Sequence, residues 1–314
     1  MRFRLTMLAV GAALIASSAA MAAGDVSIPG ARVFPESITS TQDGTLYIGS
    51  IGEAQVYRAA PGAATAEPFI KPNPQLRSIT GVLADEGSGT LYVCTNDWSM
   101  LGVTSPGGKG PPTLMAYDLK TGAPKGSYVF PGNAGFCNDI AIGADGAAYV
   151  TDSVMPRVLR LKKGGSALEE WVKNDMFGTK GINLDGIAFG TDGNLYVTGF
   201  GESKMFMIAV GKDMSAGAMT QLAGDPVKNP DGFRKLAGGT GNQFLLAEGG
   251  HMSLVTIDGG KYSVKVLAED AGAVGVTQVG KTAYVVSGEI NYLFAPNLKG
   301  KNPPPFVAKA VTLK

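Results

Sequence analysis

The stretch NLDGIAFGTDGNLYVTGF, residues 183–200, contains the unit that is repeated along this chain. A carboxylate stands two positions before an apolar residue, a turn rich in Gly and Asp follows, and a second apolar run comes after it. Val, Ile, Tyr and Phe alternating between such turns are typical of two β-strands joined by a hairpin. The unit therefore predicts a hairpin with one polar side chain where its first strand begins.

Six units of this kind occur along the chain. The apolar residues that open their first strands are 43 to 58 residues apart: Ile38, Val82, Ile140, Ile187, Phe233 and Val276. The longest spacing includes the Gly- and Pro-rich segment LGVTSPGGKGPP, residues 101–112. One or two amphipathic strands follow each hairpin, so a unit has about four strands, as in a propeller blade. We therefore predict an all-β, six-bladed β-propeller, and regular inner strands favour it over an array of β-sandwiches.

The predicted propeller is a single domain over residues 23–314, and its ring has to close. We expect VSIPGARVF (26–34) or FVAKAVTL (306–313) to complete a blade begun at the other end of the chain. Residues 1–22 have the features of a signal peptide: Arg2 and Arg4, an apolar run, and small residues before Ala23. The alternative is an uncleaved anchor, but the run is short for a bilayer. We expect an exported protein, periplasmic or secreted, with no membrane association after cleavage.

Composition excludes one class of partner and permits a disulfide. The formal net charge is +1, charged residues make up 17%, and no basic stripe is present, which argues against nucleic-acid binding. The two cysteines, Cys94 and Cys137, are predicted at the same mouth of adjacent blades. An oxidising compartment would allow them to form a disulfide. The alternative is a pair of buried free thiols.

Four polar residues share one phase of the repeat. Each stands two positions before the residue that opens an inner strand: Glu36 in PESI, Asn138 in CNDI, Asp185 in LDGI and Asp231 in PDGF. The equivalent positions of the other two blades are Thr80 and Val274. Because the inner strands surround one axis, four side chains at this phase converge on it. Oxygen ligands without imidazole or thiolate favour calcium, although other divalent cations are possible. The alternative is ordinary turn chemistry.

At these residues the chain resembles the gluconolactonase, senescence-marker-protein and luciferin-regenerating-enzyme family of six-bladed propellers. The family has a Glu at its first inner strand, an Asn in an N-D segment, an Asn in a P-N-G-I-A segment and an Asp in a P-D-G segment. The corresponding segments here are PESI, FCNDIAIG, NLDGIAFG and NPDGF. Asp185 stands where the family usually has an amide, which adds a negative charge to the site.

The resemblance implies a calcium-dependent hydrolase that opens a lactone, with sugar lactones as the leading class, or a related ester. It assigns Asp231 as general base or nucleophile, and Asn138 as a metal ligand or substrate contact. Two alternatives remain. One is a non-catalytic ligand-binding propeller with a structural cation. The other is a relative that cleaves phosphotriesters, or that condenses small molecules as strictosidine synthase does.

Other catalytic apparatus is scarce in the sequence. His251 is the only histidine, which excludes a histidine-dyad lactonase and a histidine-rich zinc site. The loops that follow the second strands are expected to roof the pocket. They contain Asp152, Trp98 and Glu289, and we expect Asp152 to contact the substrate.

Overall fold

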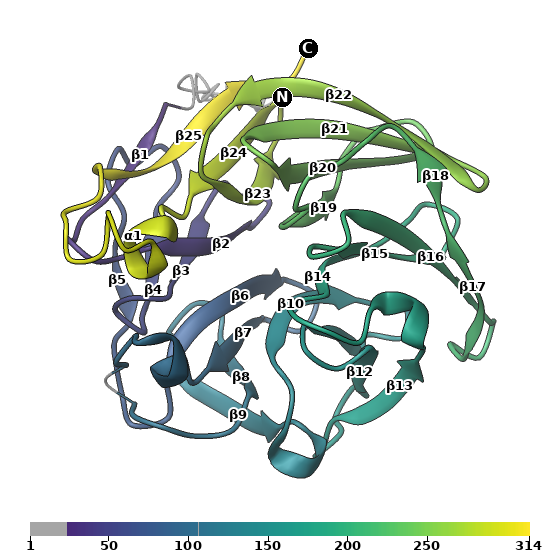
Figure 1. Ribbon diagram of the computed structural model, residues 1–314, viewed down its shortest axis with the longest axis horizontal. Helices are drawn as coiled ribbons and strands as arrows, with labels where there is room; N and C mark the ends of the chain where they lie inside the picture. The colour runs from purple at the N-terminus through teal and green to yellow at the C-terminus, as the bar shows by residue number, and fades with distance from the viewer. Residues whose placement is uncertain (1–23, 106) are drawn as a thin grey trace, which may run out of the picture.

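The computed structural model describes residues 24–105 and 107–314. Six antiparallel sheets stand around a central axis as the blades of a propeller (Figure 1). The predicted all-β, six-bladed fold is confirmed. The predicted signal peptide, residues 1–22, lies outside the described residues.

Each blade is a sheet whose first strand lines the axis. The first blade contains β2 (Pro35–Ser40), β3 (Leu46–Ser50), β4 (Val56–Ala59) and β5 (Glu67–Ile70). The second contains β6 (Ser78–Asp85), β7 (Thr90–Asn96), β8 (Thr113–Asp118) and β9 (Pro124–Val129). The third contains β10 (Cys137–Ile142), β11 (Ala148–Asp152), β12 (Arg157–Leu161) and β13 (Glu169–Lys173).

The other three blades repeat the pattern, with one additional strand at the outer edge of the fifth blade. The fourth contains β14 (Leu184–Phe189), β15 (Leu195–Gly199), β16 (Lys204–Val210) and β17 (Ala216–Gln221). The fifth contains β19 (Phe233–Lys235), β20 (Asn242–Glu248), β21 (His251–Asp258) and β22 (Lys261–Glu269), with β18 (Ala223–Gly224) beside β22. The sixth contains β23 (Ala273–Val279), β24 (Thr282–Ser287), β25 (Phe306–Thr312) and β1 (Val26–Ile28).

The ring closes through strands from the two ends of the described chain. In the sixth blade β1 pairs antiparallel with β25, and Val26 lies opposite Ala308 while Ile28 lies opposite Phe306 (Figure 1). The expected closure is confirmed, with the N-terminal strand on the outside. A blade cannot bury both of its faces alone, so a closed ring leaves no inner face without a neighbour.

The hydrophobic core lies between the blades. Tyr47 and Val56 of the first blade, for example, pack in one cluster with Val82 and Val93 of the second. The first two strands of the first blade, β2 and β3, are buried at almost every position, whereas the outer strand β22 has only exposed and half-buried positions. The stacked inner strands thus form a rigid frame around the axis.

In the part of the chain that the structure describes, helices occur only in the connections between strands. They are α1 (Asn291–Phe294) and three short 3₁₀ segments, η1 (Ser99–Leu101), η2 (Pro131–Asn133) and η3 (Asp175–Phe177). Over residues 24–105 and 107–314, no helix has the length and apolar character that crossing a membrane requires.

A disulfide joins Cys94 of β7 to Cys137 of β10, as the sequence predicted. Both residues are fully buried, and the bond links the second blade to the third. Cys137 directly precedes Asn138, so the bond fixes the backbone from which that candidate ligand projects.

The Cys94→Ala/Cys137→Ala variant should be less stable than the wild type by about 4 kcal/mol, because it removes a cross-link that closes a 43-residue segment. Denaturant unfolding of the oxidised wild type and the variant measures the difference. A loss below about 1 kcal/mol would show that the bond does not constrain the unfolded chain.

Candidate active site at the channel mouth

The four candidate ligands lie where inner strands begin, at one mouth of the central channel. Pairing of the inner strand with the second strand is irregular there, between Pro35 and Ser37 in the first blade and between Cys137 and Ile140 in the third. The fourth blade has the same irregularity between Leu184 and Ile187. A β-bulge redirects side chains relative to the regular pleat. The bulges therefore turn Glu36, Asn138 and Asp185 away from the core between blades, whereas Asp231 lies just before its strand.

Glycines at this level allow neighbouring blades to approach each other closely. A Cβ on Gly186 would lie 2.4 Å from the backbone oxygen of Asp231, and a Cβ on Gly275 would lie 2.9 Å from that of Glu36. Neither Gly186 nor Gly232 has a positive φ angle. The Asp-Gly pairs at 185–186 and 231–232 are therefore close-approach positions rather than left-handed turns.

Hydroxyl groups fix the backbone of the ligand positions from the preceding blade. Thr151 Oγ1 donates a hydrogen bond to Asp185 O at 2.6 Å, and Ser153 Oγ donates to Leu184 O at 2.6 Å. Asn138 Nδ2 donates to Ser153 Oγ at 2.9 Å and to Asp185 Oδ2 at 3.0 Å. No hydrogen bond of the described residues ends on Asn138 Oδ1, so its amide oxygen is free to accept.

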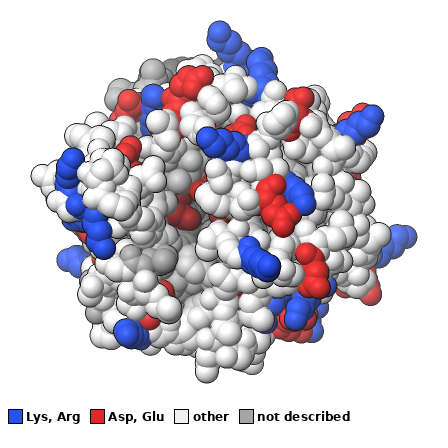
Figure 2. All heavy atoms as spheres, viewed as in Figure 1, with Lys and Arg blue, Asp and Glu red and all other residues white. Residues whose placement is uncertain are grey.

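The structure brings Glu36, Asn138, Asp185 and Asp231 together in one buried cluster. Their exposed fractions are 7%, 4%, 4% and 7%. Figure 2 shows acidic atoms within the hollow at the centre of the molecule. The phase of the repeat therefore identified side chains that lie close to one another.

Burial is the main cause of the raised pKa values of the carboxyls in the cluster. Burial, together with the charge of the nearby Asp139, raises the pKa of Asp185 to about 8, although hydrogen bonds involving Asp231 and Asn138 and the charge of Arg234 act in the opposite direction. Burial, followed by the charge of Asp185, raises the pKa of Glu36 and of Asp231 well above the ordinary values. Three carboxylates therefore share a space that disfavours their full ionisation.

A buried ion pair that sequence reasoning missed spans the channel next to the cluster. Arg234 of β19 contacts Asp139 of β10 through two nitrogen–oxygen distances of 2.5 and 2.9 Å, and it donates to Val82 O of β6 at 3.3 Å. Asp139 is separated from Arg234 by 95 positions, so no local motif could have indicated the pair. Arg234 is matched to Asp139, and no ion pair of the described residues involves Glu36, Asp185 or Asp231.

The cluster has the donor chemistry of a hard-cation site but not a closed arrangement. Within residues 24–105 and 107–314, no three or more His, Cys, Asp or Glu side chains are arranged to hold a metal ion. The available donors are carboxylate oxygens and the free amide oxygen of Asn138, which are the ligands that calcium prefers. The three carboxyls form no ion pair among the described residues, although the charge of Arg234 lowers the pKa of Glu36 and of Asp185, and ionising them together without a cation would be costly. The donor set therefore fits a divalent cation.

Asp152 is engaged in structure rather than open to a ligand. It is fully buried, its Oδ1 accepts a hydrogen bond from the backbone nitrogen of Phe136 at 2.9 Å, and its Oδ2 pairs with Arg157 Nε at 2.9 Å. The same Oδ1 also accepts from the backbone nitrogens of Val154 and Met155. These contacts fix the connection around Asp152, which corrects the expected substrate contact.

Trp98 is a packing residue above the first blade. It is 8% exposed, and its ring lies 5.8 Å from that of Phe136 and 5.7 Å from that of Phe294 at the end of α1. The contact joins the η1 connection of the second blade to the α1 connection of the sixth. These two connections therefore hold each other in place beside the mouth.

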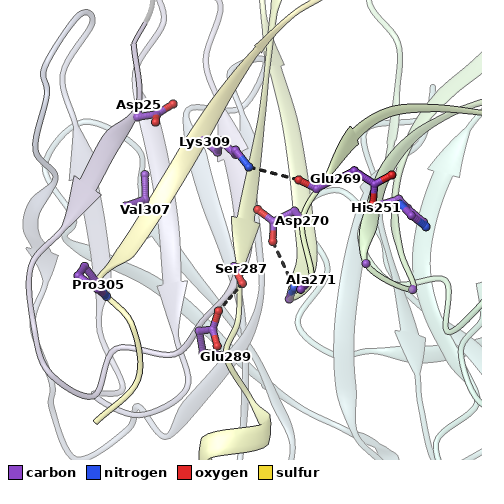
Figure 3. A pocket seen from close by; sticks show the side chains of 13 residues that line it. Asp25, His251, Glu269, Asp270, Ala271, Ser287, Glu289, Pro305, Val307 and Lys309 are labelled. Atoms are coloured by element: carbon purple, nitrogen blue, oxygen red, sulfur yellow. Dashed lines mark hydrogen bonds and ion pairs between the residues drawn. The ribbon is translucent and has the colours of Figure 1, made fainter.

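Two cavities that share lining residues lie between the fifth and sixth blades. The inner cavity has a volume of about 540 Å³ and contains Asp231, Asn229 and Tyr292 in its lining. The outer cavity has a volume of about 730 Å³ and is lined by His251, Glu269 and other polar residues (Figure 3). His251 therefore lies in the outer cavity and not in the carboxylate cluster. Of the four candidate ligands, only Asp231 lines the inner cavity.

Comparisons with known proteins find the fold and no sequence family. No protein-family model and no curated protein matches this chain. The chain is similar to the Malassezia sympodialis allergen Mala s 1, with a TM-score of 0.71 and 13% identity over 92% of this chain and 96% of that chain. It is also similar to a Xanthomonas campestris gluconolactonase (TM-score 0.62, 17% identity, 90% and 86% covered). A luciferin-regenerating enzyme matches with a TM-score of 0.60 and 13% identity over 90% and 94%.

These similarities confirm the predicted resemblance to gluconolactonase-like propellers at the level of the fold. At such identities they show the fold alone. The chemistry has to be argued from the site.

Gly186→Ala should lower the free energy of unfolding by about 1–3 kcal/mol, because its Cβ would press on the backbone of Asp231. Gly260→Ala is the matched control, since a Cβ there meets nothing within 4 Å. Denaturant unfolding of both variants measures the effect. Equal stability of the two variants would contradict the close-approach role.

The chelator-treated protein should lose stability as pH rises. A carboxyl whose pKa is raised in the folded state contributes full stability below its unfolded pKa, and that contribution is lost as pH rises through the folded pKa. For Asp185 the window runs from the ordinary value of 3.8 to about 8. Unfolding at a series of pH values should show a shallower slope in Asp185→Asn than in the wild type. Identical slopes in the two proteins would contradict the raised pKa of Asp185. Asp213→Asn, which changes a carboxylate at an exposed turn, is the control.

Proposed function

We propose that this chain is a calcium-dependent hydrolase that opens a lactone, a sugar lactone foremost, or a related ester at the channel mouth. The observation that carries the proposal is the cluster of three buried carboxyls that form no ion pair within the described part of the chain, beside an amide oxygen that is free to accept. Similarity in fold to a gluconolactonase supports the class of reaction.

Glu36, Asn138, Asp185 and Asp231 would hold the cation. The amide hydrogens of Asn138 are already donated to Ser153 and Asp185, which favours its oxygen as a metal ligand over a substrate contact through nitrogen. When bound, a divalent cation polarises a carbonyl group and offsets the charge that develops on its oxygen. The extra charge of Asp185, at a position where related propellers usually have an amide, should tighten binding.

Asp231 is the proposed general base. It is the member of the cluster that lines the inner cavity, so it can reach a substrate there. Its raised pKa brings a carboxylate closer to the working pH, where general bases are most effective. Asp231 accepts a proton from a water molecule whose oxygen attacks the carbonyl carbon. The ring carbon–oxygen bond then breaks, and the proton is passed to the leaving oxygen.

We also propose that the protein is exported. The support is the buried disulfide between Cys94 and Cys137, because such bonds persist in oxidising compartments. The expected signal sequence in residues 1–22 agrees with this location.

Asp231→Asn should abolish calcium-dependent lactone hydrolysis, with a loss of about 10²–10⁴-fold in kcat, because it removes the proton acceptor. Calcium titration calorimetry on the same samples should show weaker binding, since the variant removes a charged ligand. Asp213→Asn, which removes an exposed turn carboxylate, is the matched control and should behave as the wild type.

The outcomes separate the competing functions. Calcium binding without turnover of any lactone would contradict the enzyme and favour a ligand-binding propeller with a structural cation. Turnover of phosphotriesters, or condensation of small molecules, in place of lactone opening would favour the third alternative. The absence of calcium binding would overturn the metal site itself.

A further inference from the structure

The inner cavity beside Asp231 is not closed on its outer side. It shares five lining residues with the outer cavity: Gly249, Gly250, Ala271, Gly272 and Glu289. The two cavities are therefore parts of one groove, which runs from Asp231 outward between the fifth and sixth blades. We call this the 5–6 groove.

The shared section of the 5–6 groove is lined mostly by backbone. Gly249 and Gly250 connect β20 to β21 with φ values of +41° and +102°, where side chains are rarely found. Gly272 has no room for one, because its Cβ would lie 2.0 Å from Ser287 Oγ. Glu289 is thus the shared residue with a side chain longer than a methyl group. A ligand that extends from Asp231 toward the outer cavity has to pass its carboxylate.

The groove offers hydrogen-bond acceptors that the protein does not use. Ser287 Oγ donates to Glu289 Oε1 at 2.8 Å (Figure 3), and the backbone nitrogen of Gly272 donates to Asp270 Oδ1 at 3.2 Å. Asp25 Oδ1 accepts from a backbone nitrogen at 2.8 Å. The second oxygen of each of these carboxylates accepts no hydrogen bond from the described residues.

The cationic groups of the outer cavity are turned to the protein itself. Lys309 Nζ donates to the backbone oxygen of Glu269 at 3.2 Å. His251 Nδ1 lies 3.0 Å from Glu269 Oε2, although outside the direction of a hydrogen bond. Four carboxylates line the outer cavity against one lysine and one histidine, and the inner cavity adds Asp231 and Lys228. An anionic ligand would be repelled, and an apolar ligand would strip water from Glu289 without replacing its hydrogen bonds.

We propose that the 5–6 groove binds the non-reacting portion of the substrate, that this portion carries a protonated amine, and that Glu289 is a specificity-determining residue. The inference rests on the proposed lactone-opening function, and it names the substrate class. An ammonium group donates up to three hydrogen bonds and matches the free acceptor oxygens of the groove.

Two δ-lactones test the proposal, one with a flexible aminoalkyl chain and one with the same chain N-acetylated. Wild type should hydrolyse the amine with about tenfold higher kcat/KM, through a lower KM, because only the amine forms a charge-assisted hydrogen bond with Glu289. Glu289→Gln should raise KM for the amine and bring the ratio close to one. Glu67→Gln, in the outer strand of the first blade, is the matched control and should keep the tenfold ratio. An equal preference in wild type and Glu289→Gln would overturn the proposal.

Binding of the two corresponding lactams separates this proposal from the proposed hydrolysis. Lactams resist hydrolysis, so calorimetry reports the groove whether or not the protein turns over lactones. Tighter binding of the amine lactam that is lost in Glu289→Gln supports the groove even if no lactone is cleaved. Equal binding of the two lactams to wild type overturns it even if lactones are cleaved. Thermal melting of Glu289→Gln verifies that the variant is folded.

Discussion

The close approach of the inner strands around one axis is the constraint on which the rest of the structure depends. Neighbouring inner strands approach each other closely where they begin, and at Gly186 and Gly275 this approach leaves no room for a side chain. The same approach forces polar side chains from different blades into one small, buried space. The geometry that closes the ring is therefore also what makes the carboxylate cluster.

Like charges in a buried space raise the free energy of the folded protein unless they are protonated or paired. Arg234 and Asp139 satisfy each other beside the cluster, and the pair ties the fifth blade to the third. Glu36, Asp185 and Asp231 have no such partner among the ion pairs of the described residues. The raised pKa values reflect the cost of burying these carboxylates together, and a bound divalent cation would offset that cost. Stability and metal binding are thus two aspects of one electrostatic balance.

The fold and the candidate ligand positions could be predicted from the sequence, because both repeat along the chain. The six strand-opening residues and the phase of Glu36, Asn138, Asp185 and Asp231 can be read without structure. The Arg234–Asp139 ion pair could not be predicted, because it depends on which blades face each other across the channel. The sequence also suggested that Asp152 lies in the pocket. Its position along a strand does not reveal that its oxygens already accept hydrogen bonds from Arg157 and from backbone nitrogens. Contacts between residues that are distant in the sequence can be identified only in the three-dimensional structure.

The most direct test is a crystal structure of the protein grown or soaked with calcium. We predict one ion at the channel mouth, at about 2.3–2.6 Å from oxygens of Glu36, Asn138, Asp185 and Asp231. Side chains that are not closed around a common point here should turn toward it. Electron density without an ion at saturating calcium, or an ion bound elsewhere with the cluster unchanged, would contradict the account.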